Sequence, residues 1–143
     1  MADIFHQFTI KATGQQVFQA VATPTGLDAW WTLSSSGQPA EGATWRLWFG
    51  PEYDWRATVT RCAPGSEFEL ELTDAMEDWV NTRVGFSLTE KEGVTTVRFY
   101  HIGWSEPSQH YCISSYCWAM YLRLLKRYVE RGEITPYEAR DEA

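Results

Sequence analysis

Two histidines and two cysteines lie close together in the C-terminal third of the chain, and their side chains are the ones best suited to chemistry. His101 and His110 could act as an acid and a base, because imidazole titrates near neutral pH. No third residue is placed by the sequence to orient either ring. We therefore favour a hydrogen-bonded core role for His101 and a solvent-facing role for His110. His101 remains the best candidate for a polar group in a pocket.

The same stretch offers soft metal ligands in Cys112 and Cys117. These cysteines are five positions apart, so on a helix their side chains point about 140° apart. Such a pair cannot easily share one tetrahedral ion, and we expect neither a metal nor a cofactor. With Cys62 they form an odd set without a CxxC pair, which is not typical of a disulfide framework. Small, buried apolar roles are favoured for these thiols.

Signatures of nucleophilic catalysis and of phosphate binding are absent from the sequence. There is no GxSxG motif, no Cys–His pair at a known spacing and no glycine-rich phosphate loop. Ser114 and Ser115 are better suited to lining a cavity with polar groups. Glu69 and Glu71 alternate with apolar residues, so we expect both carboxylates on the exposed side of a strand. No catalytic residue is assigned.

Aromatic side chains are abundant, with 8 Trp, 7 Tyr and 7 Phe. Such rings can wall a cavity for an apolar ligand, or they can simply fill a core. For any single ring the core role is favoured, and for the whole set we expect a cavity. The candidate rings are Trp30, Trp31, Trp45, Trp55, Trp79, Phe86, Phe99, Trp104, Tyr111, Trp118 and Tyr121.

The elements that would position these side chains follow from periodicity and capping signals. A strand over 4–10 precedes a helix capped by Thr13 with Gln16 in a capping box, and Pro24 starts a second short helix that carries Trp30 and Trp31. Residues 34–39 are expected to be a loop. Alternating residues predict five further strands, over 44–49, 53–61, 67–73, 80–89 and 94–102.

The last predicted element is a long helix from about 106 to 131, capped by Ser105 and ended by Gly132. A run of strands followed by a helix indicates an α+β fold, not βαβ units. We expect a single domain over residues 1–132 and a polar, only partly ordered tail over 133–143.

Composition restricts the class of function. Hydrophobic residues make up 44% and charged residues 22% of 143 residues, as in one globular domain. The net charge of -7 and the scattered Lys and Arg argue against nucleic acid or an anionic membrane as partner. The first residues lack a basic start and an apolar stretch, so we expect no signal peptide and a cytoplasmic location.

The order of elements, with landmarks at matching places, resembles the AHSA1-type branch of the START-like (SRPBCC) superfamily, named after activators of Hsp90 ATPase. Each motif alone is weak, and their ordered spacing from about residue 4 to 131 makes the resemblance specific. One departure is Cys117, where the family usually has Gly. The landmarks are VFQAVATP over 17–24, LDAWW over 27–31, Trp79 with TRVGFSL over 82–88, TVRFYHIG over 96–103 and WAMYL over 118–122.

The resemblance implies a helix-grip (Bet v 1-like) fold: a curved antiparallel sheet wrapped around the C-terminal helix, with two short helices after the first strand. It also implies a cavity between sheet and helix, but not one activity, because this fold hosts many functions. On the expected inner faces we assign ligand-lining roles to Trp31, Trp45, Trp55, Phe86, Phe99, His101, Tyr111, Ser115, Trp118 and Leu122.

Three functional hypotheses remain open from the sequence. The first is non-enzymatic binding of a small hydrophobic or aromatic molecule, lipid-like or polyketide-like, by a monomer or weak homodimer. The second, implied by the family name, is regulation of a chaperone ATPase of the Hsp90 type, or a stress-response interaction module. The third is a cyclase- or hydratase-like enzyme that uses His101, and it ranks lowest because no acid–base set converges in the sequence.

Overall fold

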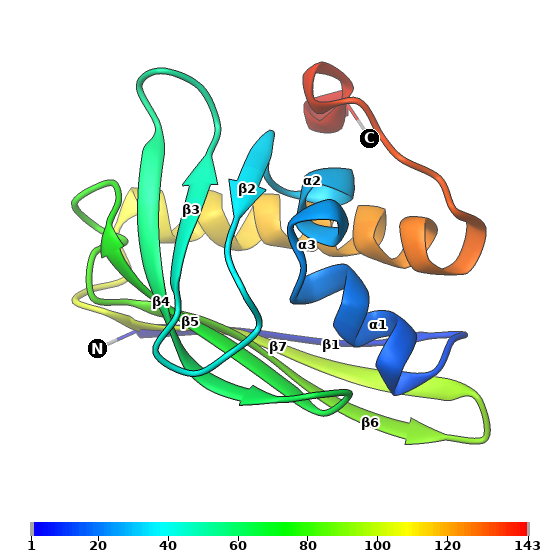
Figure 1. Ribbon diagram of the computed structural model, residues 1–143. Coiled ribbons are helices and arrows are strands. Elements are labelled where there is room, and N and C mark those ends of the chain that lie inside the picture. Colours follow the sequence, from blue (N-terminus) through cyan, green and yellow to red (C-terminus); the bar gives the residue numbers. More distant parts are fainter. Residues whose placement is uncertain (1, 143) are drawn as a thin grey trace.

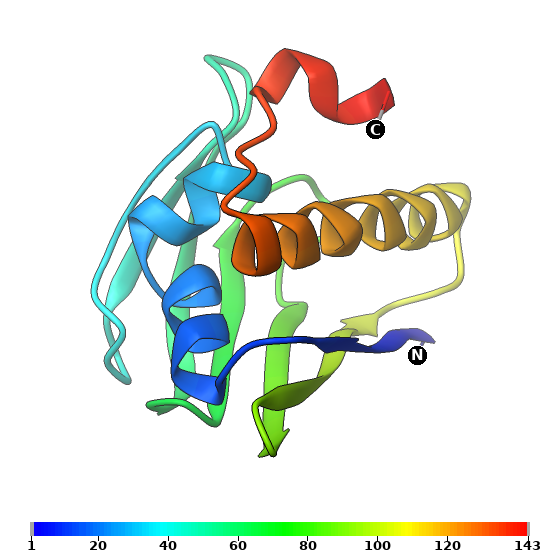
Figure 2. The same ribbon diagram turned by 90° about the vertical axis from the view of Figure 1, so that its right-hand side faces the viewer.

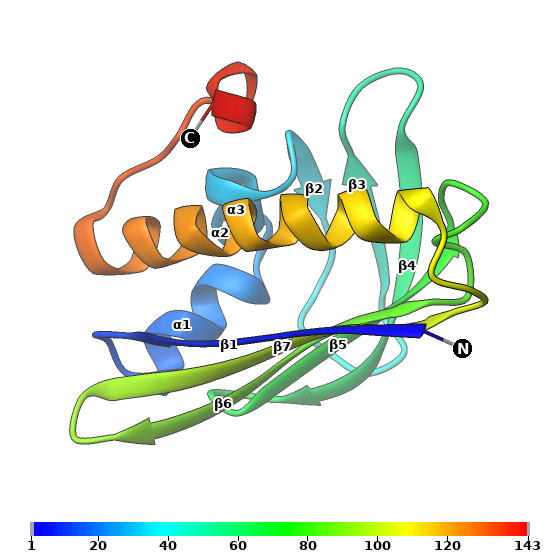
Figure 3. The same cartoon turned by 180° about the vertical axis from the view of Figure 1, so that it is seen from behind.

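The computed structural model describes residues 2–142 and has the predicted α+β, helix-grip architecture. A seven-stranded antiparallel sheet curves beneath the long helix α3 (Gln109–Arg131), as Figures 1 and 2 show. The two short helices α1 (Gly14–Val21) and α2 (Pro24–Trp30) close one end of the layer between sheet and helix (Figure 3). The core therefore lies between the concave face of the sheet and α3.

The sheet runs in the order β1-β7-β6-β5-β4-β3-β2, with every neighbouring pair antiparallel. Its inner face is built on alternation: Phe68, Phe86 and Phe99 stand opposite one another on three adjacent strands and are all buried. The strands are β1 (Ala2–Ile10), β2 (Ser34–Ser36), β3 (Thr44–Trp48), β4 (Asp54–Ala63), β5 (Glu67–Asp74), β6 (Arg83–Lys91) and β7 (Val94–Trp104).

The predicted helix signals are confirmed at three ends and wrong at one. Thr13 and Gln16 form the capping box of α1, Pro24 lies at the start of α2, and Gly132 ends α3 with a φ of 67°. The start of α3 lies later than expected, because Ser108 and not Ser105 is the capping residue. Pro107 disfavours a helical backbone at the residue before it, so the helix cannot begin at 106.

Two further predictions about local structure are corrected. Residues 34–36 form the edge strand β2 instead of a loop. Their composition is typical of a turn, but their backbone pairs with β3. Glu69, which we expected on the exposed side of its strand, is only 3% exposed. Tyr100 Oη donates to one of its carboxylate oxygens, and Thr60 Oγ1 donates to the other at 2.7 Å. Gly85 makes this possible, because a Cβ there would lie 2.2 Å from the Tyr100 ring.

A directional chain of hydrogen bonds crosses the core from α3 to the loop between β5 and β6. Trp118 Nε1 donates to His101 Nδ1 at 3.1 Å, so the neutral ring of His101 carries its proton on Nε2. That nitrogen lies 2.8 Å from Thr82 Oγ1, and the Thr82 hydroxyl in turn donates to the carbonyl of Trp79 at 2.6 Å. We call these four residues the indole relay.

Burial of the relay holds His101 in its neutral form. The ring is fully buried, and desolvation, with a smaller repulsion from His110, lowers the pKa of His101 from 6.5 to about 3. Protonation of Nδ1 would also remove the acceptor that Trp118 uses. The favoured core role for His101 is thus what the structure shows.

No helix among residues 2–142 is both long enough and apolar enough to span a bilayer.

The relay makes folding stability depend on pH in a defined window. Because the pKa of His101 is lowered in the folded state, the unfolded chain binds more protons between pH 6.5 and about 3, and the free energy of unfolding falls as pH falls through that range. The slope should approach about 1.4 kcal/mol per pH unit. Above pH 6.5 His101 contributes no pH dependence.

Denaturant unfolding of the wild type and of His101→Gln, measured across this range, checks the effect. The glutamine keeps a donor and an acceptor but does not titrate, so its curve should be shallower by the His101 contribution. Parallel curves for the two proteins would contradict the assignment of a neutral, buried His101.

Candidate functional site

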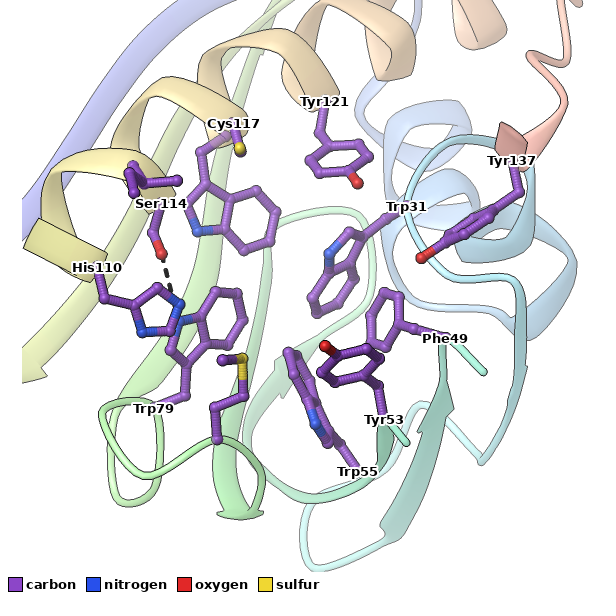
Figure 4. A pocket seen from close by; sticks show the side chains of 13 residues that line it. Trp31, Phe49, Tyr53, Trp55, Trp79, His110, Ser114, Cys117, Tyr121 and Tyr137 are labelled. Atoms are coloured by element: carbon purple, nitrogen blue, oxygen red, sulfur yellow. Dashed lines mark hydrogen bonds between the residues drawn. The ribbon is translucent and has the colours of Figure 1, made fainter. Parts of the chain in front are cut away.

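A pocket of about 250 Å³ opens between α3, the hairpin of β3 and β4, and the loop that joins β5 to β6 (Figure 4). Eight of its lining side chains are Trp, Tyr or Phe, which is typical of sites for apolar ligands. The pocket lies beside the indole relay, because Trp79 and Trp118 belong to both. Its lining residues are Trp31, Phe49, Tyr53, Trp55, Met76, Trp79, His110, Ile113, Ser114, Cys117, Trp118, Tyr121 and Tyr137.

Five of these rings follow one another in a closed circuit, each in contact with the next. Trp31 lies 5.0 Å from Trp118 and 5.6 Å from Phe49, measured between ring centroids. Phe49 lies 4.8 Å from Trp55, and Trp55 lies 5.0 Å from Trp79. Trp79 closes the circuit against Trp118 at 6.0 Å. We call these five residues the aromatic circuit, and it forms an apolar wall whose members come from five separate segments.

Three tyrosines border the pocket from three different segments: Tyr53 before β4, Tyr121 on α3 and Tyr137 in the C-terminal tail. Burial, followed by nearby Tyr137 and Asp141, raises the pKa of Tyr121 to about 12, and burial also raises the pKa of Tyr137. The phenols of Tyr121 and Tyr137 therefore stay protonated near neutral pH, and a phenol can both donate and accept a hydrogen bond. The tyrosines can therefore orient an uncharged polar group.

The loop that carries Trp79 is tied to the start of α3 by polar contacts. Trp79 Nε1 donates to Ser114 Oγ at 3.3 Å. His110 stacks on Trp79 with ring centroids 6.3 Å apart, and its Nδ1 lies 3.3 Å from an oxygen of Asp78. His110 is thus partly exposed at the pocket edge, while His101 is buried outside the pocket lining. The structure does not bring the two histidines into one site as an acid–base pair.

Part of the polar C-terminal tail has regular structure and packs against α2. Residues 137–142 form a short 3-10 helix, η1 (Tyr137–Glu142), in which Arg140 is only 2% exposed. Composition does not reveal that this single arginine is buried against α2.

Of the ten residues assigned to ligand lining from sequence, three line this pocket: Trp31, Trp55 and Trp118. The structure places the rest elsewhere. Buried core positions are occupied by Trp45, Phe86, Phe99 and His101. Tyr111 donates to the carbonyl of Asp3 at the edge of the sheet, Leu122 lies in a separate groove against β1, and Ser115 lines neither of these two sites.

The pocket follows one flank of α3, not its whole inner face. Ser114, Trp118 and Tyr121 are spaced four and three residues apart and share that flank, whereas Ser115 and Leu122 lie one position further round. This spacing was available in the sequence, since Ser114 and Tyr121 are already candidates there. No sequence signal identifies Phe49 or Tyr137, because the segments that carry them reach the pocket only through the fold.

Cys117, the departure from the family pattern, is part of the pocket wall, and burial raises the pKa of its thiol. All three cysteines are free. Within residues 2–142 no group of three or more His, Cys, Asp or Glu side chains is arranged to hold a metal ion.

Comparison with known proteins agrees with this architecture. The solution structure of the Aha1 dimer from Colwellia psychrerythraea superposes with a TM-score of 0.83 at 32% identity, covering 92% of this chain and 98% of that one. Protein SSP2350 from Staphylococcus saprophyticus (TM-score 0.78, 19% identity, 94% and 96% covered) shares the fold, as does CalU16 from Micromonospora echinospora (0.76, 21%, 98% and 84%).

No curated protein matches the chain significantly. The family model described as activator of Hsp90 ATPase homolog 1-like protein matches residues 11–130, which is most of the chain. The chain therefore belongs to the activator of Hsp90 ATPase homolog 1-like family.

Proposed function

We propose that the protein binds a small, uncharged aromatic or apolar molecule in the pocket between the sheet and α3, without chemical conversion. The observation that carries this proposal is the aromatic circuit, which walls a pocket of about 250 Å³ instead of filling it. A dry cavity of about 150 Å³ is enough for one benzene ring. The pocket is therefore matched to a molecule of two or three rings rather than to a long acyl chain.

The chemistry of the lining supports an uncharged ligand. Among the described residues that line the pocket there is no Lys, Arg, Asp or Glu. An ionic group buried there would lose its hydration without gaining a partner of opposite charge, which is unfavourable. The phenols of Tyr53, Tyr121 and Tyr137, with Ser114 Oγ, can instead orient a hydroxyl or carbonyl group on an aromatic ligand.

The exposure of several apolar side chains around this pocket also supports a binding site. Tyr53, Met76 and Ile113 are 42%, 41% and 52% exposed and all belong to its lining. Exposed large apolar side chains that gather around one concavity are typical of a binding site, whereas scattered single ones need no explanation. A ligand seated in the pocket would cover part of this area.

Two cysteines on α3 allow the proposal to be tested with matched substitutions. Cys117→Phe places a ring in the pocket, whereas Cys112→Phe places the same ring on an exposed position of the same helix. The probe is N-phenyl-1-naphthylamine, an uncharged fluorescent aromatic compound. We expect saturable binding by the wild type with a raised melting temperature, since a ligand of the native state stabilises it.

Cys117→Phe should weaken probe binding by about tenfold or more, the effect of about 1.4 kcal/mol, while Cys112→Phe should bind as the wild type does. Titrations followed by probe fluorescence and by energy transfer from tryptophan give both affinities. Equal binding by the two variants would place the probe outside this pocket. Failure of the wild type to bind any member of a panel of neutral bicyclic and tricyclic aromatics would overturn the proposed function.

A second candidate function is regulation of a chaperone ATPase of the Hsp90 type. Membership of the family and 32% identity to the Colwellia Aha1 chain favour it. Tyr116 on the outer side of α3 is 81% exposed and lies outside the pocket lining, so it is a candidate contact.

This candidate predicts that the protein raises the ATPase rate of purified Hsp90, and that Tyr116→Asp reduces the stimulation without changing probe binding. An ATPase rate that does not respond to saturating protein would exclude it.

An enzyme of the cyclase or hydratase type with His101 as its base receives no support from the geometry. His101 has both ring nitrogens engaged in the indole relay and does not line the pocket. A general base must reach the proton that it removes, directly or through one water.

A further inference from the structure

The C-terminal tail returns over α3 and α2 after the long helix has ended at Gly132. Figures 1 and 2 show the tail leaving the end of α3 and running back so that η1 lies above α2. Tyr137, the first residue of η1, belongs to the pocket lining together with Tyr121 of α3 and Tyr53 of the hairpin. The tail thus supplies the part of the pocket wall that the sheet and the three helices leave open.

One side chain holds this segment in place. Arg140 donates to four backbone carbonyls with its three guanidinium nitrogens: Nη1 to Trp31 and Thr32 at 2.9 and 3.1 Å, Nη2 to Asp28 at 2.8 Å, and Nε to Thr135 at 2.9 Å. Asp28, Trp31 and Thr32 lie at the C-terminal end of α2, where unpaired carbonyls and the helix dipole favour a cation. This compensates the buried charge of Arg140.

Arg140 also contacts two residues of the pocket lining, Tyr137 on the tail and Trp31 at the end of α2. Its Cζ lies 5.3 Å from the centre of the Tyr137 ring, a cation–π arrangement that orients this ring. The carbonyl that it binds on Trp31 belongs to a member of the aromatic circuit. Arg140 therefore positions two walls of the pocket, one on the tail and one at the end of α2.

We propose that η1 is a latch that closes the aromatic pocket, with Arg140 as its positioning residue and Tyr137 as the residue that covers the ligand. The inference deepens the proposed function and rests on it for what the latch encloses. When the latch is released, the carbonyls of α2 become accessible to water, so opening does not strand buried polar groups. The rest of the fold does not depend on the tail, because the sheet and α3 pack on each other without it.

The thiol of Cys117 reports on the latch without any ligand. Cys117 lines the pocket with Tyr137, and burial, with a smaller effect of Asp141 in the tail, raises the pKa of this thiol. Opening should both expose the sulfur and lower the pKa of Cys117. Cys62, on β4, is a matched internal control, because it is half-buried and its thiol donates to the carbonyl of Pro39, away from the tail.

The experiment measures alkylation by iodoacetamide, followed by intact mass, in two backgrounds. In the first, Cys62→Ser and Cys112→Ser leave only Cys117; in the second, Cys112→Ser and Cys117→Ser leave only Cys62. Introducing Arg140→Met should raise the rate of Cys117 alkylation by about tenfold. In this variant η1 can open without breaking the charge-assisted hydrogen bonds of Arg140. Rates measured as a function of pH separate accessibility from the pKa of the thiol.

Further variants distinguish opening of η1 from a general destabilisation of the fold. Arg140→Lys keeps the charge but cannot reach all four carbonyls, so its rate should lie between those of the wild type and Arg140→Met. Tyr137→Ala should raise the alkylation rate of Cys117 although the four hydrogen bonds of Arg140 are kept. Arg131→Met, at an exposed arginine in the last turn of α3, should leave the rate unchanged.

An unchanged Cys117 rate in Arg140→Met would overturn the latch, and so would an equal rise at Cys62. Stopped-flow release of N-phenyl-1-naphthylamine adds a second readout, in which Arg140→Met should release the probe about tenfold faster. If the wild type does not bind the probe but Arg140→Met still exposes Cys117 and not Cys62, the latch stands and the proposed ligand function fails. If the probe binds and neither rate changes, the ligand function stands and the latch falls.

Discussion

The buried indole relay is the interaction on which the rest of this structure depends. It is a polar connection that joins α3, β7 and the loop after β5 through the core, and each donor in it has one acceptor. Its end members Trp118 and Trp79 are also members of the aromatic circuit, so the relay is continuous with the wall of the pocket. A break in this chain would leave polar atoms unpaired in an apolar core, so the relay favours one arrangement of the two layers.

The aromatic side chains on the sheet side of the relay are packed in the core, whereas those on its other side line the pocket. Phe99 packs against Trp118 at 4.5 Å on the sheet side, where no space is left. On the other side the rings of the circuit come from five separate segments, and Tyr137 of the tail lies in the pocket lining with them. The same residue type thus fills the core at one depth and lines the pocket at another, and Trp118 does both.

Much of the fold could be predicted from local patterns, because caps and alternation depend on neighbours in the chain. The capping box at Thr13, the end of α3 at Gly132 and the order of strands followed by a helix are examples. Predictions failed where a distant residue overrides the local pattern. Glu69 alternates like an exposed residue, yet it is buried because Tyr100 reaches it across Gly85 from a strand two places away.

The sequence by itself determined the fold class, the family and the abundance of aromatic side chains, and it placed Trp31, Trp55 and Trp118 among the candidates. Only the tertiary structure decided which rings surround open volume and which are packed shut. That distinction depends on how five separate segments meet and on the small space that they leave, which no periodicity within one segment encodes. For the same physical reason the sequence gives no sign that Arg140 is buried: its carbonyl acceptors on α2 lie more than a hundred residues away along the chain.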